Sequence, residues 1–250
     1  MGNNLKAHLI EIFPSFQGEG ILTGTPQIFI RFAGCLLDCS YCDTDTSFQN
    51  NVEIKKVIGE KNTLLVKNPI SVNKLLEIVH EIRERNKINW ISLTGGEPLL
   101  QIVFIKDFLN RLKKEEGLFV YLETNGVLEE NIKPIISLID FISMDFKLPS
   151  ATKKNGIFKE SKKFLSNWKE KKGQVKVVVT KNTKKSEIEK AVKIVSLIDK
   201  NIPFVILPVT PVRNICPPCQ EELFVFYKIA REHLREVFIM PQIHTIMKWQ

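Results

Sequence analysis

The stretch GCLLDCSYCDT, residues 34–44, places three cysteines within eight positions of one another. They are Cys35, Cys39 and Cys42, with the spacing C-x-x-x-C-x-x-C. Thiolates this close can converge on one metal centre. Structural zinc takes four ligands, usually as two separated pairs, and the distant CPPC (Cys216 and Cys219) could supply a pair. An iron–sulfur cluster normally has four thiolates, so three would leave one iron open for a small chelating ligand.

Outward from this loop, strand patterns and helix patterns alternate. The predicted strands span residues 27–33, 88–96, 118–126, 140–147, 174–180 and 202–211, and a final extended piece spans 236–244. The predicted helices span residues 71–86, 102–117, 130–139, 158–173, 186–200 and 220–234. Ser186 and Glu189 have the spacing of a capping box at the start of one helix. About six βα units predict an α/β fold with a mostly parallel sheet and helices outside it.

The segment at 51–69 interrupts this alternation and predicts a two-stranded hairpin, inserted before the first helix. We find no low-complexity linker, so we expect one domain over residues 1–250. Glycine-rich or polar motifs follow the predicted strands: the cysteine loop, TGGEP, ETNG, DFK and PVTP. Parallel βα folds bind ligands at the carboxyl ends of their strands. These motifs therefore predict one site along one rim of the sheet.

Composition limits the class of protein. A hydrophobic fraction of 44% and a charged fraction of 26% are typical of soluble globular chains. We expect no membrane span and no secretory or myristoylation signal, and so a cytoplasmic protein. Five cysteines in such a chain favour metal binding or catalysis over disulfides. The net charge of +8 is scattered, which does not predict nucleic-acid binding; a basic face could dock an acidic electron-transfer protein.

The cysteine spacing, with Tyr41 before the third cysteine, resembles the radical S-adenosylmethionine (SAM) superfamily. The resemblance implies a partial (β/α)6 barrel and a 4Fe–4S cluster on Cys35, Cys39 and Cys42. The open iron of that cluster binds the amino and carboxylate groups of SAM. Reduction then cleaves SAM to a 5′-deoxyadenosyl radical. The cofactor-binding residues implied by the family's motifs are Tyr41, Thr94, Gly95, Gly96, Glu97, Glu123, Asn125, Asp145 and Lys147.

The segments PSFQGEGILTGTPQIFIRFAGC, CDT and PQIHTIMKWQ narrow the resemblance to the 7-carboxy-7-deazaguanine synthase family. These carbon–nitrogen lyases convert 6-carboxy-5,6,7,8-tetrahydropterin to 7-carboxy-7-deazaguanine with loss of ammonia, on the route to queuosine and other deazapurines of modified tRNA. The implied substrate-binding residues are Gln17, Gly18, Glu19, Arg31, Gly95 and His244. A carboxylate such as Glu19 can accept from the pterin edge, and Arg31 suits the pterin carboxylate.

The same resemblance implies Mg²⁺ on Thr44, which follows the third cysteine, and hydrogen abstraction at C6 with SAM regenerated. A turn-capping hydroxyl is the alternative for Thr44. Family members are usually homodimers reduced by a flavodoxin or ferredoxin. Two features depart from the pattern: Asp145 stands where many relatives have serine, and CPPC has no place in the family mechanism. We expect CPPC to be a structural or incidental pair, with a second metal site or a redox pair as alternatives.

Two other functions fit parts of this sequence. An activase of glycyl-radical enzymes also carries GGEP, TNG and D-x-K, but its protein substrate needs an open face. FQGEG and the terminal Q-x-H favour a small pterin instead. A non-catalytic iron–sulfur or zinc protein that binds RNA is suggested by the positive charge alone. Production of 5′-deoxyadenosine by the reduced protein would exclude the latter.

Overall fold

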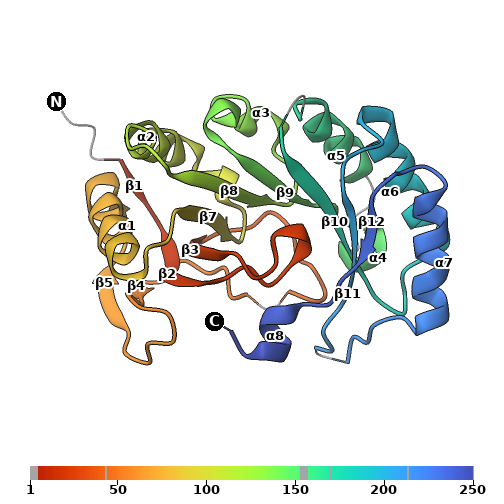
Figure 1. The fold of residues 1–250 in the computed structure, drawn as a ribbon, viewed down its shortest axis with the longest axis horizontal. Helices are drawn as coiled ribbons and strands as arrows, with labels where there is room; N and C mark the ends of the chain where they lie inside the picture. The colour runs from red at the N-terminus through yellow and green to blue at the C-terminus, as the bar shows by residue number, and fades with distance from the viewer. Residues whose placement is uncertain (1–4, 43, 153–156, 169–170, 213, 250) are drawn as a thin grey trace.

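The computed structural model describes residues 5–42, 44–152, 157–168, 171–212 and 214–249. In this part of the chain, most strands form one curved sheet, with helices along its outer side (Figure 1). The strands are β1 (Lys6–Ala7), β2 (Leu9–Phe16), β3 (Pro26–Phe32), β4 (Asn51–Ile54), β5 (Leu64–Lys67), β6 (Ile70–Ser71), β7 (Trp90–Gly95), β8 (Phe119–Thr124), β9 (Phe141–Asp145), β10 (Gly173–Val179), β11 (Phe204–Pro208) and β12 (Val237–Ile239).

The helices follow the strands in alternation. They are α1 (Val72–Asn86), α2 (Ile102–Leu112), α3 (Glu129–Ile132), α4 (Pro149–Thr152), α5 (Ile157–Ser166), α6 (Lys185–Ile198), α7 (Gln220–Arg231) and α8 (Ile243–Met247), with short 3₁₀ turns η1 (Gly20–Leu22), η2 (Pro98–Gln101) and η3 (Ile136–Leu138). None of the described helices has the length and apolar character needed to cross a membrane.

The sheet has the order β12-β11-β10-β9-β8-β7-β3-β2-β4-β5. From β3 to β12 all neighbours are parallel. Helix α1 follows β3 after the β4–β6 insertion, and β7, β8, β9, β10 and β11 are each followed by a helix, so the predicted partial (β/α)6 barrel is confirmed. Strand β2 is not among the predicted strands, and it pairs antiparallel with β3. This strand is recognised by its long-range pairing with β3 and β4.

The predicted hairpin exists and extends the sheet. Strands β4 and β5 pair antiparallel, with Val52 opposite Val66, and β4 also pairs parallel with β2. The insertion therefore lengthens the sheet on the side of the cysteine loop. Its strand β5 is the end of the sheet in the described residues.

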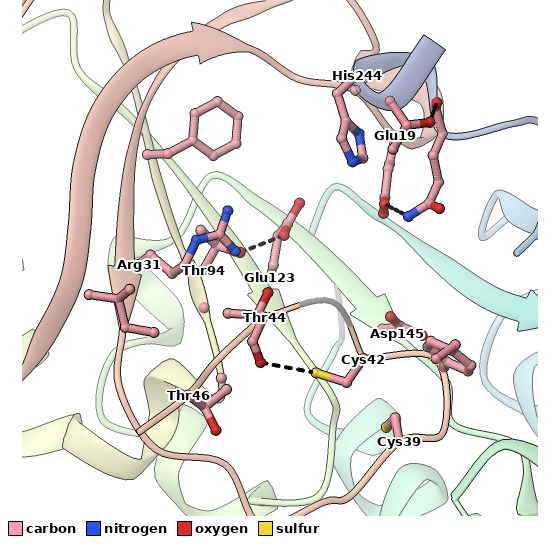
Figure 2. Close-up of a pocket in the computed structure, with 18 of the residues that line it drawn as sticks. Glu19, Arg31, Cys39, Cys42, Thr44, Thr46, Thr94, Glu123, Asp145 and His244 are labelled. Carbon is pink, nitrogen blue, oxygen red and sulfur yellow. Dashed lines mark hydrogen bonds between the residues drawn. The ribbon is translucent and has the colours of Figure 1, made fainter. Parts of the chain in front are cut away.

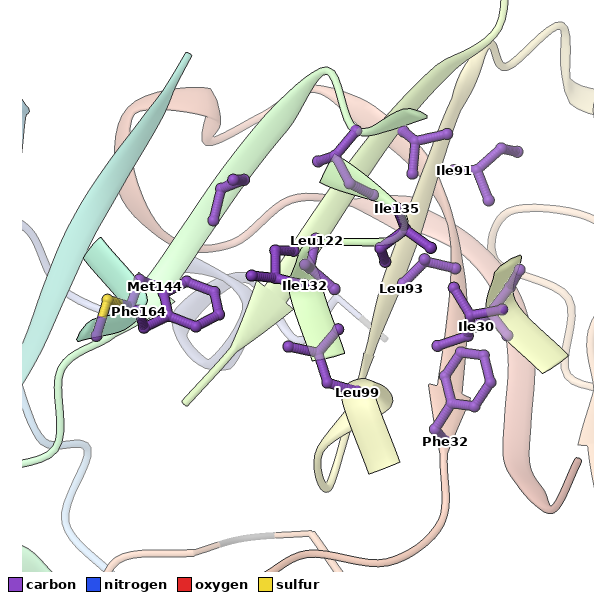
Figure 3. Packing of buried hydrophobic residues seen from close by; sticks show 14 of the residues in the cluster. Ile30, Phe32, Ile91, Leu93, Leu99, Leu122, Ile132, Ile135, Met144 and Phe164 are labelled. Atoms are coloured by element: carbon purple, nitrogen blue, oxygen red, sulfur yellow. The ribbon is translucent and has the colours of Figure 1, made fainter. Parts of the chain in front are cut away.

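Successive side chains of each strand point to opposite faces of the sheet, so each strand contributes to an outer face and to an inner face. In β8, Leu122 belongs to the main hydrophobic core under the helices, whereas the neighbouring Glu123 lines a cavity on the inner side. The other parallel strands repeat this division. Figure 3 shows the outer-face packing of Ile30, Ile91, Leu93, Leu122 and Met144 from successive strands, with Leu99, Ile132 and Phe164 from the helical side. The functional side chains are therefore on the inner face.

Several predicted boundaries were wrong. Helix α2 ends at Leu112 rather than Gly117, and α7 ends at Arg231. The helix predicted at 130–139 divides into α3 and η3 around Pro134, because proline cannot donate to the preceding turn. The final extended piece contains only β12, and the chain then turns into α8.

The predicted capping box at Ser186 and Glu189 was also wrong, because α6 starts earlier. Its N-cap is Lys184, and Glu187 lies at the third position of the helix. The Glu187 carboxylate accepts hydrogen bonds from the backbone N–H groups of Lys184, at 2.9 Å, and Ser150, at 2.7 Å. The helix start is thus fixed partly by a contact with α4 that local spacing does not reveal.

Candidate functional site

A cavity of about 750 Å³ opens on the inner side of the sheet, at the carboxyl ends of the strands. Cys39 and Cys42 lie at one end of the view in Figure 2, Glu19 and His244 lie at the other, and Thr44 and Glu123 lie between them. All the predicted site residues except Glu97 line this cavity: Gln17, Gly18, Glu19, Arg31, Cys35, Cys39, Tyr41, Cys42, Thr44, Thr94, Gly95, Gly96, Glu123, Asn125, Asp145, Lys147 and His244. The structure therefore brings the separate motifs together.

The three cysteines of the motif are free thiols in this structure. Cys39 is buried, and Cys35 and Cys42 are half-buried. Burial raises the pKa of Cys35, and raises the pKa of Cys39 to about 11, against the opposing charge of Lys147. Thiols must lose their protons to bind iron, so metal binding and deprotonation are coupled at this loop.

The donor set fits an iron–sulfur cluster better than a single ion. Among the described residues, no group of three or more Cys, His, Asp or Glu side chains is arranged to hold one metal ion. In a cluster each cysteine binds a different iron, so the sulfurs need not converge on one point. The Cys35 sulfur also accepts from the Leu37 N–H at 3.5 Å, with the Asn125 amide at 4.0 Å. Such N–H···S contacts stabilise cluster thiolates.

The TGGEP segment packs directly against the cysteine loop. A Cβ on Gly96 would lie 2.0 Å from the Gly34 carbonyl oxygen, and Gly95 has φ +120° with its α-carbon against Phe32. The Glu97 N–H donates to the Gly34 carbonyl at 2.8 Å. Both glycines line the cavity. They are also required for the contact between two backbone segments that form the cavity wall.

Glu97 is fully buried behind this wall. Its carboxylate accepts from the backbone of Asn125 at 2.8 Å, the backbone of Leu99 at 3.1 Å and the hydroxyl of Thr124 at 2.9 Å. Burial raises the pKa of Glu97 to about 7, although these hydrogen bonds lower it. In this structure Glu97 joins the ends of β7 and β8, so its predicted contact with a cofactor stays a prediction while its positioning of Asn125 is observed.

Asp145 and Lys147 form an ion pair at the end of β9, with Nζ and Oδ2 2.7 Å apart. The Lys147 ammonium also contacts the Tyr41 hydroxyl at 3.2 Å and lies 5.1 Å from the centre of its ring. Burial alone would lower the pKa of Lys147, but Asp145, Tyr41 and Cys39 together outweigh it and hold the pKa well above the ordinary value. Tyr41, Val212 and Ile215 each pack against a small cluster of buried side chains, Val178, Val205, Leu207 and Val209. A positive charge is thereby fixed beside the thiols.

Glu123 faces the amino-terminal loop rather than the Asp145 side. Its carboxylate accepts from the Gln17 amide at 3.1 Å and the Thr94 hydroxyl at 2.7 Å. The Lys176 ammonium is 4.0 Å from the same carboxylate. Glu123, predicted as a cofactor-binding residue, is thus tied to Gln17, which was predicted to bind substrate.

Glu19 is held on both sides. Lys176 pairs with Oε2, and the Gln242 amide donates to Oε1 at 2.8 Å. Burial alone would raise the pKa of Glu19, but Lys176, Gln242 and His244 outweigh it and lower the pKa to about 2. The cavity therefore presents an ionised carboxylate here.

His244 enters the cavity from the start of α8 because Gly18 leaves room for it. A Cβ on Gly18 would lie 2.3 Å from Nδ1 of His244. The Gly18 carbonyl accepts from the Ile243 N–H at 2.9 Å. The terminal helix is thus fastened to the FQGEG segment and covers one end of the cavity.

Arg31 projects from β3 to the inner side, where Nε donates to Glu11 on β2 at 2.6 Å. The guanidinium also lies over the ring of Phe13, 5.9 Å from its centre. Its two terminal nitrogens remain on the cavity side and suit a bidentate carboxylate. Thr44 also lines the cavity, and its carbonyl accepts from the Cys42 thiol at 3.5 Å (Figure 2).

Sequence reasoning missed four side chains of this site, Glu11, Lys176, Thr210 and Gln242, and all of them line the cavity. Glu11 lies among apolar residues in HLIEIF, and Lys176 lies among valines in QVKVVV. A polar residue that alternates with apolar ones in a strand is typical of an inner-facing position. Thr210 and Gln242 lie in loops and carried no comparable signal. CPPC lies outside this set: Cys216 and Cys219 are exposed free thiols, and Cys219 is the N-cap of α7.

Comparisons with known proteins agree with this geometry. The family model described as the radical SAM superfamily matches residues 29–211. A 7-carboxy-7-deazaguanine synthase from Geobacter sulfurreducens is 34% identical over 248 residues, covering 96% of this chain and 97% of that protein. The one from Methanocaldococcus jannaschii is 32% identical, covering 95% and 98%. The crystal structure of QueE from Escherichia coli is similar in fold, with a TM-score of 0.56 at 19% identity over 96% of this chain and 95% of that one.

Proposed function

The chain belongs to the radical SAM superfamily and, within it, to the 7-carboxy-7-deazaguanine synthase family, and on that premise we propose that it converts 6-carboxy-5,6,7,8-tetrahydropterin to 7-carboxy-7-deazaguanine with release of ammonia. The observation that carries this proposal is one cavity with three thiols at one end and the Glu19 carboxylate at the other. A cofactor and a small polar substrate would meet between them.

The cavity chemistry suits both ligands. When bound, the cluster on Cys35, Cys39 and Cys42 supplies the electron that cleaves SAM and starts the radical reaction. SAM would lie against Gly95, Gly96, Asn125, Asp145 and Lys147, which line the cavity nearest the cysteines or contact them. Asp145 replaces the serine of many relatives, and its pairing with Lys147 leaves Oδ1 without a partner among the described residues.

The substrate would occupy the other end. Glu19 is an acceptor for the N–H groups of the pyrimidine edge, and Arg31 is a cation for the pterin carboxylate. Gln17 and Glu123, joined at 3.1 Å, would orient the ring between them. His244 and α8 would exclude water from this end. These residues position the substrate, and the bound cofactor carries the difficult chemistry.

Mg²⁺ belongs to the proposal as well. Thr44 lines the cavity between the thiols and the substrate end, where a hard cation could bind its oxygen together with substrate oxygens and water. We also propose a flavodoxin or ferredoxin as the reductant and a homodimer as the assembly. The end strand β12 exposes Phe238 and Ile239, which supports a subunit contact there.

The reaction is tested anaerobically with reconstituted protein, SAM, dithionite, Mg²⁺ and 6-carboxytetrahydropterin. We expect mass spectrometry to detect 7-carboxy-7-deazaguanine, and Cys39→Ala to abolish it. Cys219→Ala, at an exposed thiol outside the cavity, is the matched control and should form product normally. Deoxyadenosine without deazaguanine would retain the radical SAM chemistry but overturn the pterin substrate, and would favour a glycyl-radical activase.

A further inference from the structure

Lys176 is a buried cation in the cavity that the family resemblance does not account for. It projects from the inner face of β10 and is 3% exposed. Its ammonium pairs with Glu19 and lies 4.0 Å from Glu123. A buried charge is costly unless it is paired, so the position of Lys176 between two carboxylates needs an explanation.

The contacts of Lys176 fix Glu19 in place. One carboxylate oxygen bonds to Lys176, and the other accepts from the Gln242 amide at 2.8 Å. Gln242 is itself fixed, because its carbonyl oxygen accepts from the Thr210 hydroxyl at 2.5 Å. A carboxylate offers about four lone-pair sites, so two remain for a ligand. Segments from β10 and from the loops after β11 and β12 thus hold Glu19 with its remaining acceptors toward the cavity.

The same contacts keep Glu19 ionised. The charged or titratable groups around it are Lys176 on β10, His244 on α8, and Glu123 and Tyr121 on β8; Asp145 on β9 acts through Lys176. Burial alone would raise the pKa of Glu19, and Lys176 is the largest influence that lowers it. Without Lys176, burial and the nearby Glu123 would both favour the protonated acid, which donates as well as accepts.

We propose that Lys176 is a positioning residue that keeps Glu19 in its acceptor-only form, and that it thereby makes the cavity select a 2-amino-4-oxopyrimidine edge over a 2,4-dioxo edge. This inference rests on the proposed function. The amino edge presents two adjacent N–H donors, which an ionised carboxylate accepts. The dioxo edge replaces the amino group with a carbonyl oxygen, which an ionised carboxylate repels. A protonated Glu19 would instead donate to that carbonyl and lose the discrimination.

The test uses two stable probes that differ only at this edge, 6-carboxypterin and 6-carboxylumazine. Their affinities are measured by anaerobic calorimetry on the reconstituted enzyme with SAM, at pH 6 and pH 7.5. We expect the wild-type protein to prefer the pterin by about 100-fold or more, because a site built for N–H donors rejects the analogue that lacks them. In Lys176→Met the preference should fall below about tenfold at pH 6 and partly recover at pH 7.5, as Glu19 ionises. Lys176→Arg should retain the preference.

Two further variants keep the test decisive. Lys113→Met removes another partly buried lysine, paired with Asp140 outside the cavity, and should leave the preference unchanged. If Lys176→Met does not fold, the double variant Glu19→Gln with Lys176→Met removes both charges, and should bind the two probes within about threefold at both pH values, since an amide both donates and accepts.

The outcomes separate the inference from the proposed function. An unchanged preference in Lys176→Met at both pH values, or an unchanged preference in the double variant, would overturn the role of Lys176 while the pterin substrate stands. A wild-type protein that binds neither probe and forms no deazaguanine would overturn the proposed function and this inference with it.

Discussion

The outer and inner faces of strand β8 have different roles in this molecule. In β8, Leu122 on the outer face is completely buried among apolar side chains, and its neighbour Glu123 on the inner face accepts from Thr94 and Gln17. The outer face stabilises the fold by burial, which depends on volume more than on identity. The inner face consists of charged and polar groups that need specific partners. Substitutions on the two faces should therefore affect different properties.

Leu122→Ala should have the largest effect of the changes considered. It removes a fully buried side chain, so we expect the free energy of unfolding to fall by about 3–4 kcal/mol. Urea denaturation measures this loss. At a temperature where the variant remains folded, its kcat should stay within about twofold of the wild-type value, because the cavity side chains are unchanged. A large loss of kcat in the folded variant would show that the two faces are not independent.

Glu19→Gln should destabilise the protein and do so with a characteristic pH dependence. It breaks a buried ion pair, and because Glu123 remains near Lys176 we expect a loss of about 2–3 kcal/mol at pH 7. The pKa of Glu19 is lowered from 4.5 to about 2 in the folded protein, so its ionised form stabilises the folded state. That stabilisation is complete above the unfolded pKa of 4.5 and is lost as the pH falls toward 2.

The measurement for Glu19 is urea denaturation of both proteins between pH 7 and pH 3. The difference between wild type and Glu19→Gln should be constant down to about pH 5 and then shrink. A difference that stays constant to pH 3 would contradict the lowered pKa. Glu84→Gln, at an exposed carboxylate on α1, is the control and should give a small difference at every pH.

Arg31→Met should act on binding more than on stability. Its guanidinium is partly exposed, so the loss of the Glu11 pair should cost less than about 1 kcal/mol in the free energy of unfolding. The bond to the pterin carboxylate is charge-assisted, and its loss should lower kcat/KM by roughly 30-fold, mostly through KM. Steady-state kinetics with varied pterin measures this. A fall in kcat with unchanged KM would place Arg31 in the chemical step instead.

Much of this architecture could be predicted from local patterns. The parallel strands, the hairpin at 51–69 and the convergence of the strand-end motifs follow from periodicity and turn residues. The missed features depend on long-range contacts: β2 exists through pairing with β3, and α6 starts where Glu187 meets Ser150. Gln242 reaches Glu19 across 223 positions of sequence.

In the site, too, local sequence patterns predict which side chains face inward but do not predict which of them contact one another. Lys176 could have been found, since a lysine alternating with valines in QVKVVV marks an inner position in a parallel strand. Its pairing with Glu19 could not, because no local rule says which inner side chains face each other across a curved sheet. Glu97 was predicted from its motif, but the structure shows its carboxylate bonded to the protein backbone.

The two groups of cysteines extend the comparison of inner and outer positions. The motif cysteines line the cavity, whereas Cys216 and Cys219 are exposed at the start of α7 and do not. Double substitution Cys216→Ser with Cys219→Ser should therefore give the smallest effect, with iron content, kcat and kcat/KM within about twofold of wild type. Ile215, adjacent to Cys216, provides the comparison, because Ile215 and Tyr41 of the motif loop pack against the same buried cluster of Val178, Val205, Leu207 and Val209. Ile215→Ala should loosen this shared cluster and disturb the motif loop more than removal of both thiols, measured as iron bound after reconstitution. If the double serine variant loses iron and Ile215→Ala does not, the exposed pair has a role in the site that its position outside the cavity does not explain.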